Sequence, residues 1–353
     1  MVFPKFPLTV PPTDPAKVFE MFRGNFATEI LTIAVHELKI FEQIGTNTIN
    51  SEELRKRLGL ATRPWVVITT ILKAFGFLEE LEGNLSLPEL AKNHLLEKSP
   101  FSVSSYIGLA AQSPAVQSML EKIKSNKAAE SDHGDKGAAF IFHEGIESAM
   151  EKEASARFLT LSLSGRAMNV APVLAEKYPI FDSKVLLDVG AGSGLYSIAY
   201  LEKHPQLKAI LWDSEQVLKV AREFLVTSKT LQRANCIAGD MFRDPVPNGV
   251  DTILLSNILH DWDVNECKIL VKRLASALPV GGKILVHDVL LNDELDGPKE
   301  IALYSAALFY LTEGRAYSLA EYKEWLNAEG MTLTKVIPTL AHCSVLVFEK
   351  ALG

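Results

Sequence analysis

The sequence predicts an α/β protein, with a doubly wound, mostly parallel seven-stranded sheet that follows a helical N-terminal region. Two observations predict this class. Short apolar runs alternate with helical segments in the second half of the chain, at residues 185–189, 209–212, 252–255 and 284–289. The first run ends at three alternating glycines, and a helix-forming segment follows at once, which indicates a strand, a tight turn and a helix N-terminus.

The remaining elements follow from the same kind of pattern. Residues 331–337 and 344–348 are two further strands without a helix between them, so an antiparallel pair is expected to complete the sheet. From about residue 14 to residue 99 the apolar residues recur at helical spacing. Within this region, residues 49–53 form a cap before a short helix, residues 60–65 start a second helix, and residues 75–87 alternate like a hairpin.

Two short helices and a hairpin make a winged-helix-like unit. We therefore expect an all-helical, winged-helix-like domain at 1–100, a helical connector at 101–180 and the sheet domain at 181–353. A winged helix raises the hypothesis of DNA binding, but the candidate recognition helix at 64–73 is apolar on almost every side. A helix that reads bases presents Arg, Lys, Asn or Gln. A nucleic-acid partner is therefore disfavoured, and a winged-helix regulator stays as an alternative.

The composition bounds the class of protein. A chain of 353 residues with 48% hydrophobic and 22% charged residues is typical of a globular protein of two domains. Its net charge of −7 argues against a protein that neutralises phosphates. The cysteines lie far apart without a C-x-x-C pair, so we expect reduced thiols and no metal site.

Targeting signals are also missing from the sequence pattern. The first 15 residues contain prolines and no continuous apolar core, which is not the pattern of a signal peptide. No apolar run approaches the roughly 18 residues that span a bilayer. We therefore expect a cytoplasmic protein with no membrane partner.

The glycine loop brings bare backbone N–H groups to a small polar ligand. Its pattern is G-x-G-x-G, preceded by Asp188. A dinucleotide-binding loop would need its third small residue at position 195, where Leu195 stands instead. A nicotinamide site is thus disfavoured, which leaves another nucleotide-like cofactor or simple tight packing of strand against helix.

In an open parallel sheet the ligand lies beyond the carboxyl ends of the strands, so the strand ends carry the functional signal. Asp213 ends the second run, where a carboxylate can accept both hydroxyls of a ribose, although it can also cap the next helix. Asp240 and Met241 precede an aromatic ring at 242, a combination suited to the edge and face of adenine. Taken alone, that segment is a turn followed by core residues.

The next run ends in His-Asp-Trp at 260–262. With this segment, the chain resembles the S-adenosylmethionine-dependent O-methyltransferases of the caffeic acid and hydroxyindole type over nearly its whole length. The resemblance rests on the order of the features: helical domain, glycine loop, acidic ribose residue, Gly-Asp-Met-Phe at 239–242, His-Asp-Trp, and Leu-Pro-x-Gly-Gly at 278–282. It implies a class I, Rossmann-like methyltransferase that binds S-adenosylmethionine and a small-molecule acceptor.

The resemblance also assigns the site residues. In the cofactor site, the glycine loop would hold the methionyl part, Asp213 the ribose, and Asp240 with Met241 the adenine. The full cofactor set is Asp188, Gly190, Gly192, Gly194, Asp213, Asp240, Met241, Ser256 and Trp262. A homodimer through the N-terminal domain is implied as well, and it would bury apolar helices that lack enough partners within one chain.

His260 matches the general base of the family, and Asp288 matches the first of two acids that orient it. The chemistry agrees, because an attacking hydroxyl must lose its proton and a histidine accepts protons near neutral pH. The alternative is a histidine at a helix start that bonds only to backbone. At the position of the second acid the chain has Ala316, with Glu313 close in sequence. This departure keeps N- or C-methylation, or a family member that does not methylate, as alternatives.

The acceptor is expected to be a small aromatic or polyketide-like molecule with a hydroxyl group. By resemblance, the helix at 299–311, residues 158–169 and Gln112 would line its pocket. The candidate acceptor residues are Phe158, Met168, Leu303, Ala307 and Tyr310. Apolar side chains at helical spacing serve equally well as core. Phe142, His143 and Arg166 are further candidates, for which a structural or exposed role is expected.

Overall fold

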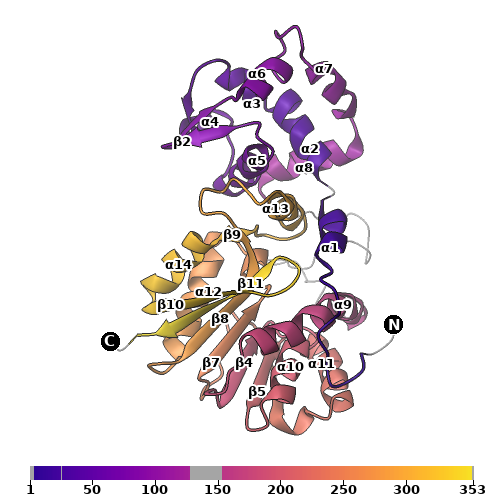
Figure 1. Ribbon diagram of the computed structural model, residues 1–353, viewed down its shortest axis with the longest axis vertical. Helices are drawn as coiled ribbons and strands as arrows, with labels where there is room; N and C mark the ends of the chain where they lie inside the picture. Colours follow the sequence, from indigo (N-terminus) through magenta and orange to yellow (C-terminus); the bar gives the residue numbers. More distant parts are fainter. Residues whose placement is uncertain (1–3, 25, 128–152, 352–353) are drawn as a thin grey trace. The chain divides into compact units, whose positions relative to one another are not determined.

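The computed structural model describes residues 4–24, 26–127 and 153–351, which divide into two compact units. We call residues 4–19, 153–290 and 319–351 the sheet unit, and residues 20–24, 26–127 and 291–318 the helical unit (Figure 1). The division departs from the expected segments, because the connector is shared between the units and residues 291–318 return to the helical unit. No helix in the described part of the chain is long and apolar enough to cross a membrane.

The helical unit is built from short helices and one longer helix that returns late in the sequence. Its helices are α2 (Ala27–Thr32), η1 (Ile33–Glu37), α3 (Ile40–Ile44), α4 (Ser51–Arg57), α5 (Thr62–Ala74), α6 (Glu89–His94), α7 (Ser104–Ile107), η2 (Gly108–Ala110), α8 (Pro114–Ser125) and α13 (Lys299–Leu311). Its strands are β1 (Ile49–Asn50), β2 (Glu79–Leu81), β3 (Asn84–Ser86) and β9 (Tyr317–Ser318). Helix α1 (Ala16–Arg23) spans the change between the units.

The winged-helix-like pattern is present. The Asn50 side chain caps α4 by accepting the N–H groups of Glu52 and Glu53. Strands β2 and β3 form the expected hairpin, and β1 adds to β3 in an antiparallel sheet of order β1-β3-β2. Apart from this small sheet the unit is helical. Helix α5 is buried along most of its length, in agreement with its apolar sequence.

The return of α13 to the helical unit has a local cause. It packs against α5, whose Arg63 is only 4% exposed. The Arg63 guanidinium donates to the carbonyls of Thr312 at 3.2 Å and Asn126 at 3.0 Å, and Lys122 donates to the carbonyl of Tyr310. Two cations therefore satisfy carbonyls at the C-terminal end of α13, where the helix dipole favours positive charge.

The sheet unit contains the predicted sheet. Its strands are β4 (Val185–Val189), β5 (Lys208–Asp213), β6 (Ala234–Ala238), β7 (Thr252–Ser256), β8 (Lys283–Leu291), β10 (Met331–Pro338) and β11 (Cys343–Lys350). They run in the order β10-β11-β8-β7-β4-β5-β6. The pairs from β6 to β8 are parallel, and β11 pairs antiparallel with both β8 and β10. The mostly parallel sheet and its antiparallel end are therefore confirmed.

Two groups of helices pack on this sheet (Figure 1). The helices of the unit are α9 (Glu153–Lys177), α10 (Leu195–Lys203), α11 (Glu215–Thr227), η3 (Leu231–Arg233), η4 (Leu259–Asp261), α12 (Val264–Ala277) and α14 (Leu319–Ala328). Helix α9 packs against α10 and α11, whereas α14 packs against α12 and β10. A buried apolar cluster from α9, β4, α10, β5 and α11 forms the core.

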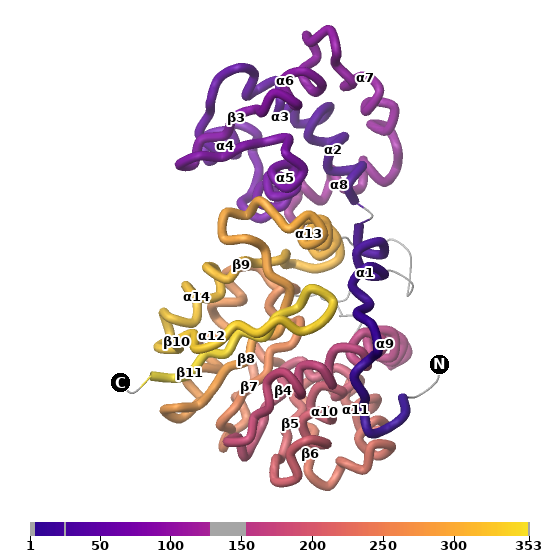
Figure 2. The backbone as a smooth tube through the Cα atoms, viewed as in Figure 1, coloured from indigo at the N-terminus to yellow at the C-terminus, as the bar shows by residue number. Residues whose placement is uncertain are grey.

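The first residues of the chain belong to the sheet unit although they precede the helical unit in sequence. Figure 2 shows this N-terminal segment running past α9. Phe6 and Leu8 pack against the core, and the N–H of Leu8 donates to Glu202 at 2.9 Å. Asp14 accepts the N–H of Ala341 at 3.0 Å. These contacts explain why residues 4–19 group with the sheet.

The strand order indicates where a ligand crevice is expected in the sheet unit. From β4, the chain continues to β5 on one side and later to β7 on the other, so the carboxyl ends of β4 and β7 flank the point where the order reverses. The glycine loop follows β4, and the His-Asp-Trp segment follows β7.

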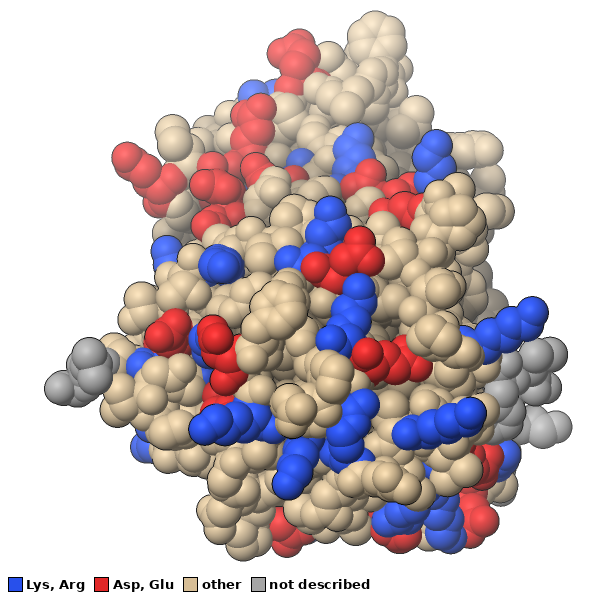
Figure 3. Space-filling model, turned by 60° about the horizontal axis from the view of Figure 1, so that its bottom comes forward, with Lys and Arg blue, Asp and Glu red and all other residues tan. Residues whose placement is uncertain are grey.

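On the face drawn in Figure 3, Lys and Arg side chains lie among Asp and Glu side chains.

Candidate active site

The three loop glycines differ in what they do. All have positive φ, at 63°, 55° and 73° for Gly190, Gly192 and Gly194. A Cβ added to Gly190 would lie 2.5 Å from Ile258 Cδ1, and one added to Gly194 would lie 2.6 Å from Leu211 Cδ2. A Cβ on Gly192 would have no described heavy atom within 4 Å. The outer glycines thus serve tight packing, and the middle glycine borders open space that a ligand can fill.

Asp213 ties this loop to the end of β5. Its Oδ2 accepts the N–H of Gly192 at 2.9 Å, and its Oδ1 accepts the N–H of Ser214 at 2.7 Å. Burial raises the pKa of this carboxyl to about 6, against the effect of the two backbone hydrogen bonds. The side chain therefore reaches both the glycine loop and Ser214, the residue that precedes α11.

Asp188 lies inside the fold instead of facing the loop's open side. It is 2% exposed, and the Ser197 hydroxyl in the first turns of α10 donates to its Oδ2 at 2.7 Å. Burial raises the pKa of Asp188 to about 7, and the charge of Asp213 adds to the rise. The hydrogen bond between Asp188 and Ser197 thus connects β4 to the first turns of α10 inside the fold.

Asp240 and Met241 follow the end of β6, a strand that is not among the predicted apolar runs. Asp240 is exposed, and its Oδ1 accepts the N–H of Phe242 at 2.8 Å. Arg273 donates to the carbonyl of Met241 at 3.1 Å. The rings of Phe242 and Trp262 meet edge to face with centroids 4.6 Å apart, so they form one aromatic corner beside Asp240.

His260 and Asp288 form a buried pair. Helix η4 presents His260 just beyond β7, and Asp288 lies in β8. Their side chains are joined by a 2.6 Å contact between His260 Nδ1 and Asp288 Oδ1, and their exposed fractions are 4% and 1%. A histidine that bonds only to backbone, the alternative considered above, does not describe this geometry.

The charges of the pair follow from its burial and its bond. For His260, burial disfavours the protonated ring, but Asp288 and Asp261 outweigh this effect and raise its pKa above the usual value. For Asp288, burial disfavours the carboxylate, but the charge and hydrogen bond of His260 lower its pKa. Asp288 therefore stays ionised and accepts Nδ1–H, which leaves Nε2 of a neutral His260 with a lone pair.

Comparison with known proteins agrees with this geometry. The O-methyltransferase domain family matches residues 132–332, more than half of the chain. The chain belongs to this family. The resemblance drawn from the sequence is therefore confirmed, and so are the fold class and the cofactor of this S-adenosylmethionine-dependent O-methyltransferase.

Three relatives illustrate the match. The 3-hydroxy-5-methyl-1-naphthoate 3-O-methyltransferase of Streptomyces sahachiroi is 29% identical over 327 residues, which cover 92% of this chain and 91% of the relative. The structure of an O-methyltransferase family 2 protein from Planctomyces limnophilus, in complex with apigenin, is 44% identical and matches with a TM-score of 0.87 over 98% of both chains. Human N-acetylserotonin methyltransferase, solved with S-adenosylmethionine, shares the fold at 19% identity, with a TM-score of 0.60 over 98% of this chain and 100% of that one.

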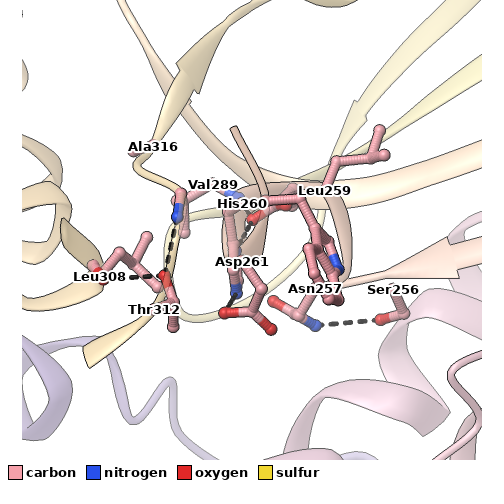
Figure 4. A network of polar contacts seen from close by, with 12 residues as sticks. Ser256, Asn257, Leu259, His260, Asp261, Val289, Leu308, Thr312 and Ala316 are labelled. Atoms are coloured by element: carbon pink, nitrogen blue, oxygen red, sulfur yellow. Dashed lines mark hydrogen bonds and ion pairs between the residues drawn. The ribbon is translucent and has the colours of Figure 1, made fainter. Parts of the chain in front are cut away.

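Ser256 belongs to a part-buried hydrogen-bond chain that links Asn257, His287 and Thr339. Its hydroxyl lies 2.9 Å from Nδ1 of His287, and the Asn257 amide donates to it at 3.0 Å (Figure 4). Nε2 of His287 lies 2.9 Å from the Thr339 hydroxyl. Burial lowers the pKa of His287 to about 3, so this ring stays neutral. Ser256 is thus held in place at the carboxyl end of β7.

The sequence pattern gave little weight to two charged groups that act on His260. Asp261 Oδ1 lies 3.7 Å from His260 Nε2, and burial raises the pKa of Asp261 to about 6. Arg166 on α9 donates to Cys343 Sγ at 2.8 Å, and its charge acts to lower the pKa of His260 and of Asp288. The spacing of residues in the sequence does not show that these groups act on His260, because Asp261 follows it directly and Arg166 lies in another helix.

The candidate acceptor residues fall in different units. Phe158 and Met168 lie on α9, where Phe158 is 67% exposed and Met168 half-buried. Leu303, Ala307 and Tyr310 lie on α13. Their other surroundings, and the further candidates, can be placed as follows. The Tyr310 hydroxyl lies 2.8 Å from the Ser118 hydroxyl, and Gln112 is exposed. Ala316 is buried, and its N–H donates to the Ser305 hydroxyl. Phe142 and His143 lie outside the described residues.

Asp188→Asn is expected to stabilise the O-methyltransferase without cofactor. A buried acid whose pKa is raised from 3.8 to about 7 destabilises the folded state. This loss of folding stability is absent below pH 3.8, grows with pH, and is complete above about pH 7. Asparagine keeps an acceptor for Ser197 and removes the charge. Urea unfolding should show a gain that grows between pH 4 and pH 7 to about 1–4 kcal/mol at pH 8. A gain independent of pH would contradict this origin.

Proposed function

We propose that this O-methyltransferase moves a methyl group to a phenolic hydroxyl of a small aromatic or polyketide-like molecule, with His260 as general base. The observation that carries the proposal is the buried 2.6 Å bond between His260 and Asp288. It holds the ring in one tautomer and directs the basic nitrogen away from the carboxylate. A histidine in this state is suited to accept the proton of a hydroxyl near neutral pH.

The proton chemistry follows from these two residues. The acceptor hydroxyl would donate to Nε2 of His260 and lose its proton as its oxygen attacks. Asp288 then stabilises the imidazolium that forms, because its carboxylate is ionised, buried and within hydrogen-bond distance. The bound cofactor supplies the methyl group as an activated sulfonium. Asp261, near Nε2, adds a second acidic group whose charge further favours the protonated ring.

The residues at the strand ends fit S-adenosylmethionine. The space beside Gly192 is open to the methionyl part, and Asp213 offers a carboxylate to ribose hydroxyls. Exposed Asp240, with the aromatic corner of Phe242 and Trp262, suits the edge and face of adenine. We keep the complete predicted set of cofactor residues as the proposal. Asp188 bonds to Ser197 at the start of the helix that follows the loop, and Ser256 ends β7, the strand paired with β4.

The acceptor class is inferred from relatives and from the chemistry of the base. The Streptomyces relative is named for a hydroxynaphthoate, and the Planctomyces structure contains apigenin, and both of these compounds are phenols. Phe158, Met168, Leu303, Ala307 and Tyr310 remain the predicted acceptor contacts. Ala316 in place of a second acid keeps transfer to nitrogen or carbon as the second candidate, because neither acceptor depends on the same pair of acids.

We also propose a homodimer through the helical unit and a cytoplasmic location. The helical unit exposes large apolar side chains, with Met21 89%, Phe22 77% and Leu109 80% exposed, which a second copy would cover. The three cysteines form no disulfide in the described part of the chain, as is usual in reducing compartments. Sedimentation should therefore give the mass of two chains, and replacement of Leu109 by Lys should shift it toward one. A purely monomeric wild-type protein would refute the dimer.

The function is tested with the purified protein, S-adenosylmethionine and a panel of phenols, hydroxyindoles and amines. Mass spectrometry should find the increment of one methylene group on phenolic acceptors, with S-adenosylhomocysteine as co-product. Boiled protein is the control. Methylation confined to amines or carbon atoms would replace the proposed hydroxyl acceptor by the second candidate.

A further inference from the structure

The orienting carboxylate of Asp288 is bonded on both of its oxygens. Oδ1 accepts Nδ1–H of His260 at 2.6 Å and the backbone N–H of Val289 at 2.8 Å. Oδ2 accepts the hydroxyl of Tyr322 at 3.2 Å. Asp288 is 1% exposed and Tyr322 is 0% exposed, so water does not compete for these bonds. The plane of the carboxylate is therefore set by three protein donors.

Tyr322 reaches Asp288 from a separate element. It lies on α14, which packs against α12 and β10, while Asp288 lies in β8. The Tyr322 ring meets Trp325 edge to face with centroids 5.5 Å apart. A buried tyrosine hydroxyl normally has a hydrogen-bond partner, and here that partner is the carboxylate beside the base. Packing thus holds the Tyr322 ring in place, and the position of α14 directs its hydroxyl toward Asp288.

An aspartate carboxylate can rotate about its Cβ–Cγ bond, and a partial rotation would turn Oδ1 out of line with Nδ1–H of His260. The bond from Tyr322 opposes this rotation, because turning the carboxylate breaks a charge-assisted hydrogen bond between two buried groups. Oδ1 is then left to Nδ1–H of His260 and to Val289. The hydroxyl also moderates the basicity of the carboxylate, since it shares the negative charge on Oδ2.

We propose that Tyr322 is a positioning residue for methyl transfer, whose hydroxyl fixes the carboxylate of Asp288 and so keeps Nδ1–H of His260 on Oδ1 and Nε2 as the atom that takes the acceptor's proton. This inference rests on the proposed function, because it takes His260 as the base. Tyr322 acts only through Asp288. The other charged groups that face His260, namely Asp261 and Arg166, are unchanged by its removal.

The test replaces Tyr322 by Phe, which keeps the ring and removes only the hydroxyl. We expect kcat for methyl transfer to apigenin to fall about tenfold to thirtyfold, with the affinity for S-adenosylhomocysteine unchanged. The acid limb of the kcat–pH profile should move to higher pH, because a carboxylate without the tyrosine bond holds the His260 proton more tightly. In the background of His260→Ala, the same replacement should cause no further loss, since the two residues act in one chain.

A spectroscopic measurement makes the test independent of the acceptor. The imidazole nitrogens of His260, assigned by their absence in His260→Gln, should show the Nδ1–H tautomer in the wild-type protein. In Tyr322→Phe we expect the pKa of His260 to rise, because the carboxylate that accepts its Nδ1–H becomes more basic. Tyr200→Phe is the matched control, because Tyr200 is equally buried on α10 and its hydroxyl has no hydrogen-bond partner among the described residues.

The outcomes separate this inference from the proposed function. If His260→Ala keeps full turnover, the general base is wrong and the proposed function fails with it. If His260→Ala is inactive while Tyr322→Phe has a wild-type tautomer, pKa and pH profile, only the role of Tyr322 is overturned. Thermal unfolding of each variant identifies a loss of structure. A Tyr322→Phe protein that loses activity with an unshifted pH profile and additive losses would also refute positioning.

Discussion

Replacing His260 by alanine is expected to lower kcat for a phenolic acceptor by about 10²–10⁴-fold, the usual contribution of a general base. The physical reason is that the acceptor hydroxyl would lose the group placed to take its proton. Affinity for S-adenosylhomocysteine should not change, because His260 follows β7 and bonds to Asp288 in β8, whereas the glycine loop follows β4. Initial rates and titration calorimetry measure the two quantities separately.

The pH dependence supplies a second readout of the same prediction. His260 must be neutral to accept a proton, and its pKa is raised above 6.5, mainly because Asp288 and Asp261 outweigh the effect of burial. Wild-type kcat should therefore rise with pH through a pKa above 6.5, and residual activity of the alanine variant should lack this limb. Full turnover in the variant would rule out His260 as the base.

Asp213→Ala is expected to raise the dissociation constant of S-adenosylhomocysteine about 100-fold. The change would remove the carboxylate proposed for the ribose hydroxyls, and it also releases the N–H of Gly192, which Asp213 accepts at 2.9 Å. Both losses act on the same ligand site. Titration calorimetry at neutral pH measures the effect.

Asp251→Ala is the matched control for this variant. Asp251 also accepts backbone N–H groups, at 2.8 Å from Lys184 and 3.2 Å from Val185, but it does so at the amino end of β4. Its removal should lower stability and leave cofactor affinity nearly unchanged. If both variants lose affinity equally, Asp213 acts through the fold in general and the ribose assignment fails.

Much of the sheet could be predicted because its central strands are buried on both faces. Strands β4, β5, β7 and β8 follow from continuous apolar runs, and the antiparallel end follows from the absence of a helix between the last two strands. Strand β6 is not among those runs. It is an edge strand with half-exposed side chains, including Asn235 and Cys236, so burial imposes no apolar run on it.

The site divides in a similar way. Glycines, an acid after a strand and a histidine after the next strand are local signals, because each lies where a parallel strand ends. Tyr322 carries no such signal. An aromatic residue on an amphipathic helix is typical of a core position, and only the packing of α14 brings its hydroxyl to Asp288. The sequence also did not show that α13 belongs to the helical unit, because this depends on contacts between distant segments. Arg63 and Lys122 bind the end of α13 across more than 180 residues.

By itself the sequence determined the order of the elements and the glycine loop, and it predicted His260 as the base and Asp288 as its carboxylate, because backbone conformation and burial leave local patterns. The tertiary structure decided what each of these residues contacts. It separated Gly192, which borders open space, from Gly190 and Gly194, which have no room for a side chain. It also turned Asp188 inward and joined Tyr322 to Asp288. Such contacts depend on distances between distant segments, which no local pattern encodes.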